Sequence, residues 1–231
     1  MVHIVIPLEN IDNGFLKGDL LIPKTVKGLM VFAHGSGSGR ESPRNQYVAN
    51  ILNVNGFATF LVDLLTQGEQ QSDLKSQKIL DKYPSLTLNK FNIKLLATRL
   101  ERVTTGLMED MSKVKNLPIG YFGSSTGAAA AIEASTSDSL FGKVYAIVSR
   151  GGRPDLANDV SIKNVKASTL LIVGAKDSKA VIDLNKKVLN QLKNTKSKEL
   201  AVIYDAGHLF EETGTIEQVA DVTVKGFTKN L

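Results

Sequence analysis

Residues 123–127, with the sequence GSSTG, match the pattern G-x-S-x-G, which can present a serine hydroxyl for attack on a carbonyl group. An apolar stretch at 119–122 precedes them, and an alanine-rich helical pattern at 127–134 follows. A tight turn between a strand and a helix strains the central serine and lifts its hydroxyl above the sheet, while flanking glycines permit close backbone approach. The spacing therefore predicts that Ser125 is a nucleophile. An ordinary turn rich in glycine and serine is the alternative.

A serine nucleophile needs a general base, and after such a turn the partners follow in the order serine, carboxylate, histidine. His208 is the one histidine after Ser125 in the sequence, and it follows an apolar stretch at 200–204. Ligand sites in open parallel sheets lie at the carboxyl ends of the strands, where this loop falls. We therefore predict that His208 takes the proton of Ser125. A histidine that is merely on the surface is the alternative.

The carboxylate that orients the histidine is expected at the end of another strand. Asp177 leaves the apolar stretch at 170–173 through a turn that contains glycine. Asp205 is the rival, but it lies so close to His208 in the sequence that its geometry is poorer. We predict that Asp177 is the orienting acid. The alternative is that Asp177 only caps the helix that begins after it.

Acyl transfer also needs two backbone N–H donors for the oxygen that becomes negative. We expect one from Thr126, the residue after the nucleophile. We expect the other from Ser36, in the glycine-rich segment HGSGSG at 34–39. His34 is expected to fix this loop through a hydrogen bond. The glycine spacing matches neither the P-loop nor the pattern G-x-G-x-x-G, which argues against a nucleotide site.

Two loops on the same side of the predicted sheet carry arginines, whose planar guanidinium suits carboxylate or phosphate oxygens. These candidate substrate-binding residues are Arg40 and Arg44, after the glycine-rich segment, and Arg150 and Arg153, after the apolar stretch at 144–148. The alternative is that they pair with Glu41 and Asp155 and only fix the loops. The first possibility predicts a preference for anionic substrates, and the second predicts none.

The elements that must position these residues alternate between two patterns. Continuous apolar stretches are typical of strands buried on both faces of a parallel sheet, and they occur at 29–33, 57–62, 119–122, 144–148, 170–173 and 200–204. Apolar residues three and four apart predict helices at 47–55, 93–114, 127–134, 181–192 and from 216 onwards. The alternation predicts a doubly wound, mostly parallel α/β sheet in a single domain over residues 1–231.

Two segments depart from this alternation. Residues 2–6 and 15–22 flank an Asp-Asn-Gly turn at 12–14, which predicts an antiparallel hairpin at the edge of the sheet. Residues 66–89 have the least pattern. Because they follow a strand, we expect either a loop over the site or a solvated surface excursion.

Composition excludes several classes of function. The 231 residues are 42% hydrophobic and 22% charged, as in ordinary soluble domains. The absence of cysteine excludes a cysteine nucleophile and thiolate metal ligands, and three histidines argue against a multi-histidine metal site. The net charge of +5 mildly favours anionic partners but is too small to indicate nucleic acid. With no apolar run near the roughly 20 residues of a membrane span and no cationic leader, we expect a cytoplasmic protein without membrane contact.

Five segments together resemble a known family: HGSGSGRESPRNQYVA, GSSTG, VSRGGRPDLA, LLIVGAKD and AGHLFEETGTIEQVA. They resemble the dienelactone-hydrolase-like branch of the α/β-hydrolases, and within it the hydrolase domain found fused to, or annotated beside, phosphoribosyltransferases. The resemblance runs from about residue 29 to 220 and implies the roles already predicted for Ser125, Asp177 and His208. Dienelactone hydrolases use a cysteine nucleophile, whereas this chain has serine there. It carries no phosphoribosyltransferase signature, so that activity is not expected.

The sequence therefore predicts a single-domain α/β-hydrolase that acts as a serine hydrolase through an acyl-enzyme. Its expected partner is a small-molecule ester, lactone or thioester of a small acid, which is anionic if the candidate arginines bind it, and no metal or organic cofactor is expected. A binding or regulatory module that kept the fold without turnover is one alternative. An acyltransferase, which would use the same residues with an acceptor other than water, is another.

Overall fold

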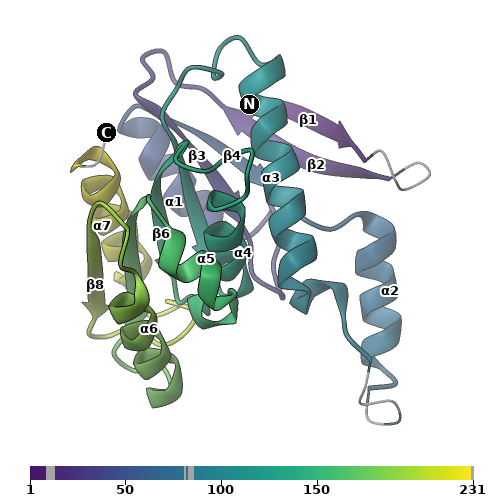
Figure 1. Cartoon of the computed structure of the whole chain (residues 1–231), viewed down its shortest axis with the longest axis vertical. Helices are drawn as coiled ribbons and strands as arrows, with labels where there is room; N and C mark the ends of the chain where they lie inside the picture. Colours follow the sequence, from purple (N-terminus) through teal and green to yellow (C-terminus); the bar gives the residue numbers. More distant parts are fainter. Residues whose placement is uncertain (9–13, 81, 83–85, 230–231) are drawn as a thin grey trace.

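Eight strands form one sheet among the residues that the computed structural model describes, which are 1–8, 14–80, 82 and 86–229. The strands are β1 (Val2–Pro7), β2 (Phe15–Leu21), β3 (Gly28–Ala33), β4 (Phe57–Val62), β5 (Ile119–Ser124), β6 (Val144–Arg150), β7 (Ser168–Gly174) and β8 (Lys198–Ile203). They lie side by side in the order β1-β2-β4-β3-β5-β6-β7-β8 (Figure 1).

The sheet is mostly parallel, with an antiparallel pair at its N-terminal edge. β1 pairs antiparallel with β2, and β2 antiparallel with β4, whereas every other neighbouring pair is parallel. Every residue of β3, β4, β5 and β7 is buried, which explains their continuous apolar sequences. The predicted α/β architecture and N-terminal antiparallel pair are confirmed. Of the predicted turn, Asp12 and Asn13 lie outside the described residues.

Helices cover both faces of the sheet (Figure 1). They are α1 (Pro43–Val54), α2 (Gln67–Gln77), α3 (Ile93–Asp110), α4 (Thr126–Ser135), α5 (Asp159–Asn164), α6 (Lys179–Gln191) and α7 (Thr215–Lys229), with 3₁₀ turns η1 (Asn89–Phe91) and η2 (Pro154–Leu156). One apolar core joins the sheet to α3, α4, α5 and α6, and a second joins it to α1 and α7. The sheet is therefore the middle of three layers.

The apolar pattern predicted at 93–114 extends beyond the helix that it produces. α3 ends at Asp110, and Met111 has an extended backbone. Val114 is nevertheless buried, because the turn after the helix folds it back onto the same core. Burial and helical conformation therefore end at different residues in this segment.

Part of the segment 66–89 forms a helix instead of the loop or surface excursion that its lack of pattern suggested. Residues 67–77 form α2, which begins with a capping box: Glu69 N–H donates to the Thr66 hydroxyl, and Thr66 N–H donates to the Glu69 carboxylate. Asp73 is the only buried residue of this helix. Because α2 buries no apolar stripe, the usual sign of an amphipathic helix is absent from its sequence. Residues 81 and 83–85 lie outside the described part.

The loops that carry the predicted site residues follow the carboxyl ends of β3, β5, β6, β7 and β8. In a parallel sheet these ends share one edge, so the fold gathers the residues there. No helix in the described part of the chain is long and apolar enough to cross a membrane.

Candidate active site

Ser125 occupies the sharp turn between β5 and α4. Its backbone has φ 49° and ψ −121°, and among the described non-glycine residues only Ser125 and Phe210 have positive φ. The turn fits tightly against β3, because a Cβ placed on Gly127 would come within 2.1 Å of the carbonyl oxygen of Ala33. A strained, non-helical residue at the head of a helix is the conformation expected of a nucleophilic serine.

His208 and Asp177 are joined by a hydrogen bond. Nδ1 of His208 lies 2.8 Å from Oδ2 of Asp177, whose side chain is 4% exposed. The rival Asp205 lies instead 3.6 Å from Lys176, and its side chain is 80% exposed. Asp177 does not cap the helix that follows, because the Ser178 side chain does so. With Nδ1–H donated to the carboxylate, Nε2 of His208 is left as the proton acceptor.

One loop after β6 contacts the backbone of both Ser125 and His208. The N–H group of Arg153 donates to the carbonyl oxygen of Ser125 at 3.0 Å. Two residues earlier, a Cβ on Gly151 would lie 2.7 Å from the carbonyl oxygen of His208. These contacts bring the serine turn and the histidine loop together at the carboxyl edge of the sheet.

The glycine-rich loop after β3 lies against the serine. A Cβ on Gly35 would come within 2.9 Å of Cβ of Ser125, so Ser36 follows at the point of closest approach. Thr126 is the first residue of α4, and a helix has no acceptor of its own for the N–H group at that position. The two N–H groups predicted to bind a developing oxyanion therefore belong to backbone on two sides of Ser125.

His34 fixes the glycine-rich loop, as its sequence position suggested. Its Nδ1 donates to the carbonyl oxygen of Gly35 at 2.9 Å, and its Nε2 accepts the N–H of Leu64 at 3.0 Å. Burial lowers the pKa of His34 below its ordinary value. Because both ring nitrogens are engaged and the ring is buried, His34 is a neutral structural group and cannot serve as the base.

Three of the four candidate arginines form ion pairs, as the loop-fixing alternative requires. Three of the five pairs join segments far apart in the sequence, so they fasten separate parts of the chain to one another. The pairs are Arg40 with Asp63 (2.6 Å), Asp19 (3.3 Å) and Glu41 (2.8 Å), Arg44 with Glu211 (2.5 Å), and Arg153 with Asp155 (2.8 Å).

Arg150 differs from the other three. It is 6% exposed, and within the described residues its guanidinium donates hydrogen bonds only to a backbone carbonyl and a side-chain amide, each at 3.4 Å. Its Nε is buried without a hydrogen-bond partner. Burial, together with the nearby charge of Arg44, lowers the pKa of Arg150 to about 10. The sequence gives no sign of this difference between Arg150 and Arg153.

Two adjoining cavities open beside the glycine-rich loop. One, of about 270 Å³, lies between that loop and α2, and its lining includes His34, Ser36, Leu65, Leu74 and Lys90. The other, of about 420 Å³, shares Gly37, Ser38 and Gln70 with the first and continues to Arg40 and Arg44. The segment that begins at residue 66 therefore forms one wall of the space next to the predicted oxyanion donors.

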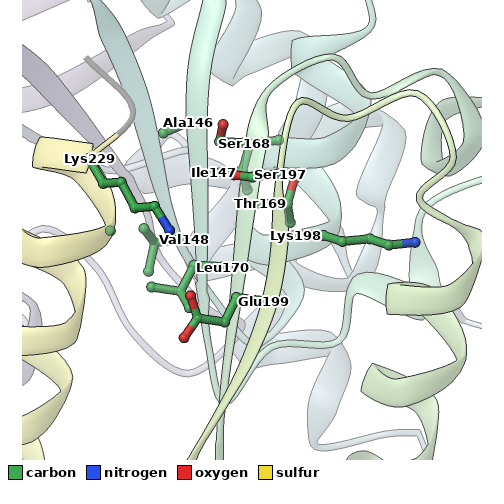
Figure 2. A pocket seen from close by; sticks show the side chains of 11 residues that line it. Ala146, Ile147, Val148, Ser168, Thr169, Leu170, Ser197, Lys198, Glu199 and Lys229 are labelled. Atoms are coloured by element: carbon green, nitrogen blue, oxygen red, sulfur yellow. The ribbon is translucent and has the colours of Figure 1, made fainter.

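A smaller cavity of about 90 Å³ lies near the amino ends of the strands, between β6, β7, β8 and α7 (Figure 2). Its lining includes Ser168 and Glu199, near the amino ends of their strands, and Lys229 at the end of α7. None of the predicted site residues borders it. It is therefore separate from the candidate active site.

Sequence reasoning missed two carboxylates that shape the site. Asp63, after β4, accepts both the backbone N–H and the side chain of Arg40. Asp73, buried in α2, accepts the backbone N–H groups of Asn89 at 2.8 Å and Lys90 at 2.9 Å, and so fastens α2 to η1. No local pattern marks either residue. Among the described residues, no cluster of three histidine, aspartate or glutamate side chains is placed to hold a metal ion.

Comparisons with known proteins identify curated relatives by sequence and solved structures with the same fold. No protein-family model matches the chain. Two curated proteins of Mycobacterium tuberculosis, from strains CDC 1551 and H37Rv, are each 45% identical over 214 residues and are named "Putative phosphoribosyl transferase". The match covers 93% of this chain but 44% of each of those proteins. The chain thus spans less than half the length of these curated relatives.

Solved structures match over the whole fold. A dienelactone hydrolase from Anabaena variabilis is 43% identical, with a TM-score of 0.88, and the match covers 100% of this chain and 97% of that one. Est1E from Butyrivibrio proteoclasticus has a TM-score of 0.75 at 14% identity, covering 99% and 98% of the two chains, which is a likeness of fold alone. From the first of these matches, the chain belongs to the dienelactone hydrolase family, within the α/β-hydrolase fold.

Proposed function

We propose that this protein is a serine hydrolase that cleaves an ester, lactone or thioester of a small carboxylic acid. The observation that carries the proposal is the 2.8 Å hydrogen bond between His208 and the buried Asp177, at the same edge of the sheet as the strained turn of Ser125. A nucleophile, a base and a group that orients the base are the parts that acyl transfer requires.

In the proposed first half-reaction, Oγ of Ser125 attacks the substrate carbonyl carbon while Nε2 of His208 takes the serine proton. Asp177 keeps the Nδ1–H of His208 in place and stabilises the imidazolium that forms. The backbone N–H groups of Ser36 and Thr126 donate to the oxyanion. The carbon–oxygen or carbon–sulfur bond then breaks, and His208 returns the proton to the leaving alcohol or thiol.

The second half-reaction regenerates the enzyme. His208 takes a proton from water, whose oxygen attacks the acyl carbon bound to Ser125. The second tetrahedral intermediate uses the same two N–H donors. It collapses to release the carboxylic acid, and the proton returns to Oγ of Ser125. No step needs a metal or an organic cofactor.

The lining of the cavity next to Ser36 supports a substrate with an apolar part. This cavity of about 270 Å³ adjoins the second one of about 420 Å³, so its own volume sets no limit on the size of the acyl group. Its lining combines Leu65 and Leu74 with polar groups. The dienelactone hydrolase relative adds support for a lactone or other ester, as its name describes. Phosphoribosyl transfer is not proposed, because the match covers less than half of the proteins so named.

A fluorophosphonate probe tests the proposal, because it reacts with activated serines. We expect the wild-type protein to be labelled on Ser125, the variant Ser125→Ala to be unlabelled, and the neighbouring-serine control Ser124→Ala to keep its labelling. Failure of the folded wild-type protein to react would favour the alternative of a binding module without turnover.

A second measurement separates hydrolysis from acyl transfer. A panel of small esters, lactones and thioesters is incubated with the enzyme in water alone and then with added alcohol or amine acceptors. The proposal expects free acid as the main product in both cases. An acyl-acceptor adduct as the main product would instead favour an acyltransferase.

A further inference from the structure

The loop that carries His208 is held at an unusual backbone conformation. Phe210, two residues after the histidine, has φ 56° and is 1% exposed. A bulky residue adopts positive φ only where its surroundings impose it. Side chains packed against this loop must therefore fix its backbone conformation, and with it the position of His208.

Arg150 is packed against that loop. Its Nη1 donates to the carbonyl oxygen of Leu209 at 3.4 Å, and its guanidinium carbon lies 5.9 Å from the ring centroid of Phe210. Its Nη2 donates to Oδ1 of Asn45, which is 1% exposed in α1. The guanidinium thus bridges the residues on the C-terminal side of His208 to the first turn of α1.

The residue after Arg150 continues the contact. Gly151 has φ 49° and approaches the His208 backbone so closely that a Cβ would lie 2.7 Å from its carbonyl oxygen. The N–H group of Gly151 donates to the carbonyl oxygen of Ile172 at 2.8 Å, in the strand that leads to Asp177. The end of β6 therefore contacts the histidine loop and is fastened to the strand that supplies the acid.

Burying a guanidinium without a carboxylate partner is unfavourable, and an apolar side chain would fill the same space without that penalty. A buried charge that lowers stability in this way is expected mainly at functional sites. The two directional contacts of Arg150, with Leu209 and Asn45, are what an apolar side chain lacks.

We propose that Arg150 is a positioning residue. Its guanidinium holds the loop that carries His208 at the position from which the histidine ring can act on Ser125. This proposal rests on the proposed function, because it assigns Arg150 a role only if His208 is the base. The sequence left two possibilities for Arg150, a direct contact with substrate or the fixing of its own loop, and the proposal instead assigns it a contact that acts through the histidine loop. Arg150 touches neither substrate nor the reacting atoms in this scheme.

The first test compares kcat and KM for matched neutral and anionic esters in wild type, Arg150→Met and Arg150→Lys. Small displacements of a catalytic group cost up to about 100-fold in rate. We expect Arg150→Met to lower kcat about 10- to 100-fold while KM for both esters changes less than about twofold. Arg150→Lys keeps the charge but has a single nitrogen, which cannot reach both acceptors in the geometry of the guanidinium. Its kcat is expected to lie between those of wild type and Arg150→Met.

A matched control separates positioning from general loss of stability. Thr104→Val removes a buried hydroxyl that lies 2.8 Å from the Tyr121 hydroxyl, in the core on the other face of the sheet. We expect this variant to lower Tm without changing kcat at 25 °C. A folded Arg150→Met variant with wild-type kcat would overturn the proposal. So would a rise in KM confined to the anionic ester, because Arg150 would then bind substrate.

A spectroscopic measurement keeps the proposal testable if turnover is absent or Arg150→Met does not fold. The chain has three histidines, so the ring signals of His208 are assigned by their loss in His208→Gln. In Arg150→Met, or in Arg150→Lys if the former does not fold, we expect these signals to shift or broaden while those of His3 do not. Unchanged His208 signals would overturn the positioning role. A wild-type protein unreactive at Ser125 would refute the proposed function instead.

Discussion

Replacing Asp177 by asparagine tests the assignment of the orienting acid, because the change preserves shape and removes charge. The Asp177 side chain is 4% exposed, and its Oδ2 lies 2.8 Å from Nδ1 of His208. A hydrogen bond to a charged partner contributes roughly 1.5–3 kcal/mol, which alone corresponds to about a 10- to 100-fold loss of rate at about 1.4 kcal/mol for each factor of ten.

The amide has a second effect, which enlarges the loss. An asparagine NH₂ group can donate to Nδ1 of His208, so that the ring proton moves to Nε2 and the nitrogen that faces the serine can no longer accept. The combined loss in kcat is expected to be about 10³- to 10⁴-fold, as in other serine triads. Steady-state hydrolysis of one small ester at fixed pH measures it.

Asp205→Asn is the matched control, because it makes the same chemical change in the neighbouring loop. Asp205 is 80% exposed in its side chain and lies 3.6 Å from Lys176, so its loss should leave kcat within about twofold. Comparable losses in the two variants, or a larger loss for Asp205→Asn, would refute the assignment of Asp177.

Three further predictions concern the framework of the site. Gly127→Ala should lower Tm sharply or prevent folding, since its Cβ would meet the carbonyl oxygen of Ala33 at 2.1 Å, and thermal unfolding measures this; an unchanged Tm would contradict the tight turn. Arg40→Met should lower Tm by a few degrees, because it breaks the pair with Asp63, yet leave the ratio of kcat/KM for anionic and neutral esters unchanged; a changed ratio would restore Arg40 as a substrate contact. Thr66→Val removes the side-chain cap of α2 and should cost about 1 kcal/mol of helix stability. We expect faster amide hydrogen exchange in residues 67–77, and unchanged exchange would show that the cap is dispensable.

The sequence was most informative where chemistry and local conformation are coupled. The spacing of residues 123–127 demands a turn between strand and helix, and Ser125 has the positive φ that such a turn imposes. Chain order then left a single histidine after the serine, and its position after a predicted strand singled out Asp177 among the seven aspartates that follow Ser125. The positions of the parallel strands followed from continuous apolar stretches, since a parallel sheet must be buried on both faces.

What the sequence did not disclose depends on contacts between distant segments. Arg44 pairs with Glu211, 167 residues away, and nothing local distinguishes it from Arg150, which has no carboxylate partner among the described residues. α2 was missed because its one buried residue is Asp73, so hydrophobic periodicity carries no signal there. Its capping box, Thr66 with Glu69, was the one local sign of a helix start.

The central claim, that Ser125 carries the acyl group during turnover, is tested most directly by trapping that intermediate. The enzyme is mixed with a small activated ester, quenched in acid within the first turnover and digested for mass spectrometry. We predict that the acyl mass is found on Ser125 in wild type and in Ser124→Ala. In wild type, the acyl group should persist longer when part of the water is replaced by a poor nucleophile than in water alone. An acyl group on any other residue would contradict this assignment. So would turnover without a covalent intermediate, if the variant Ser125→Ala also keeps its activity.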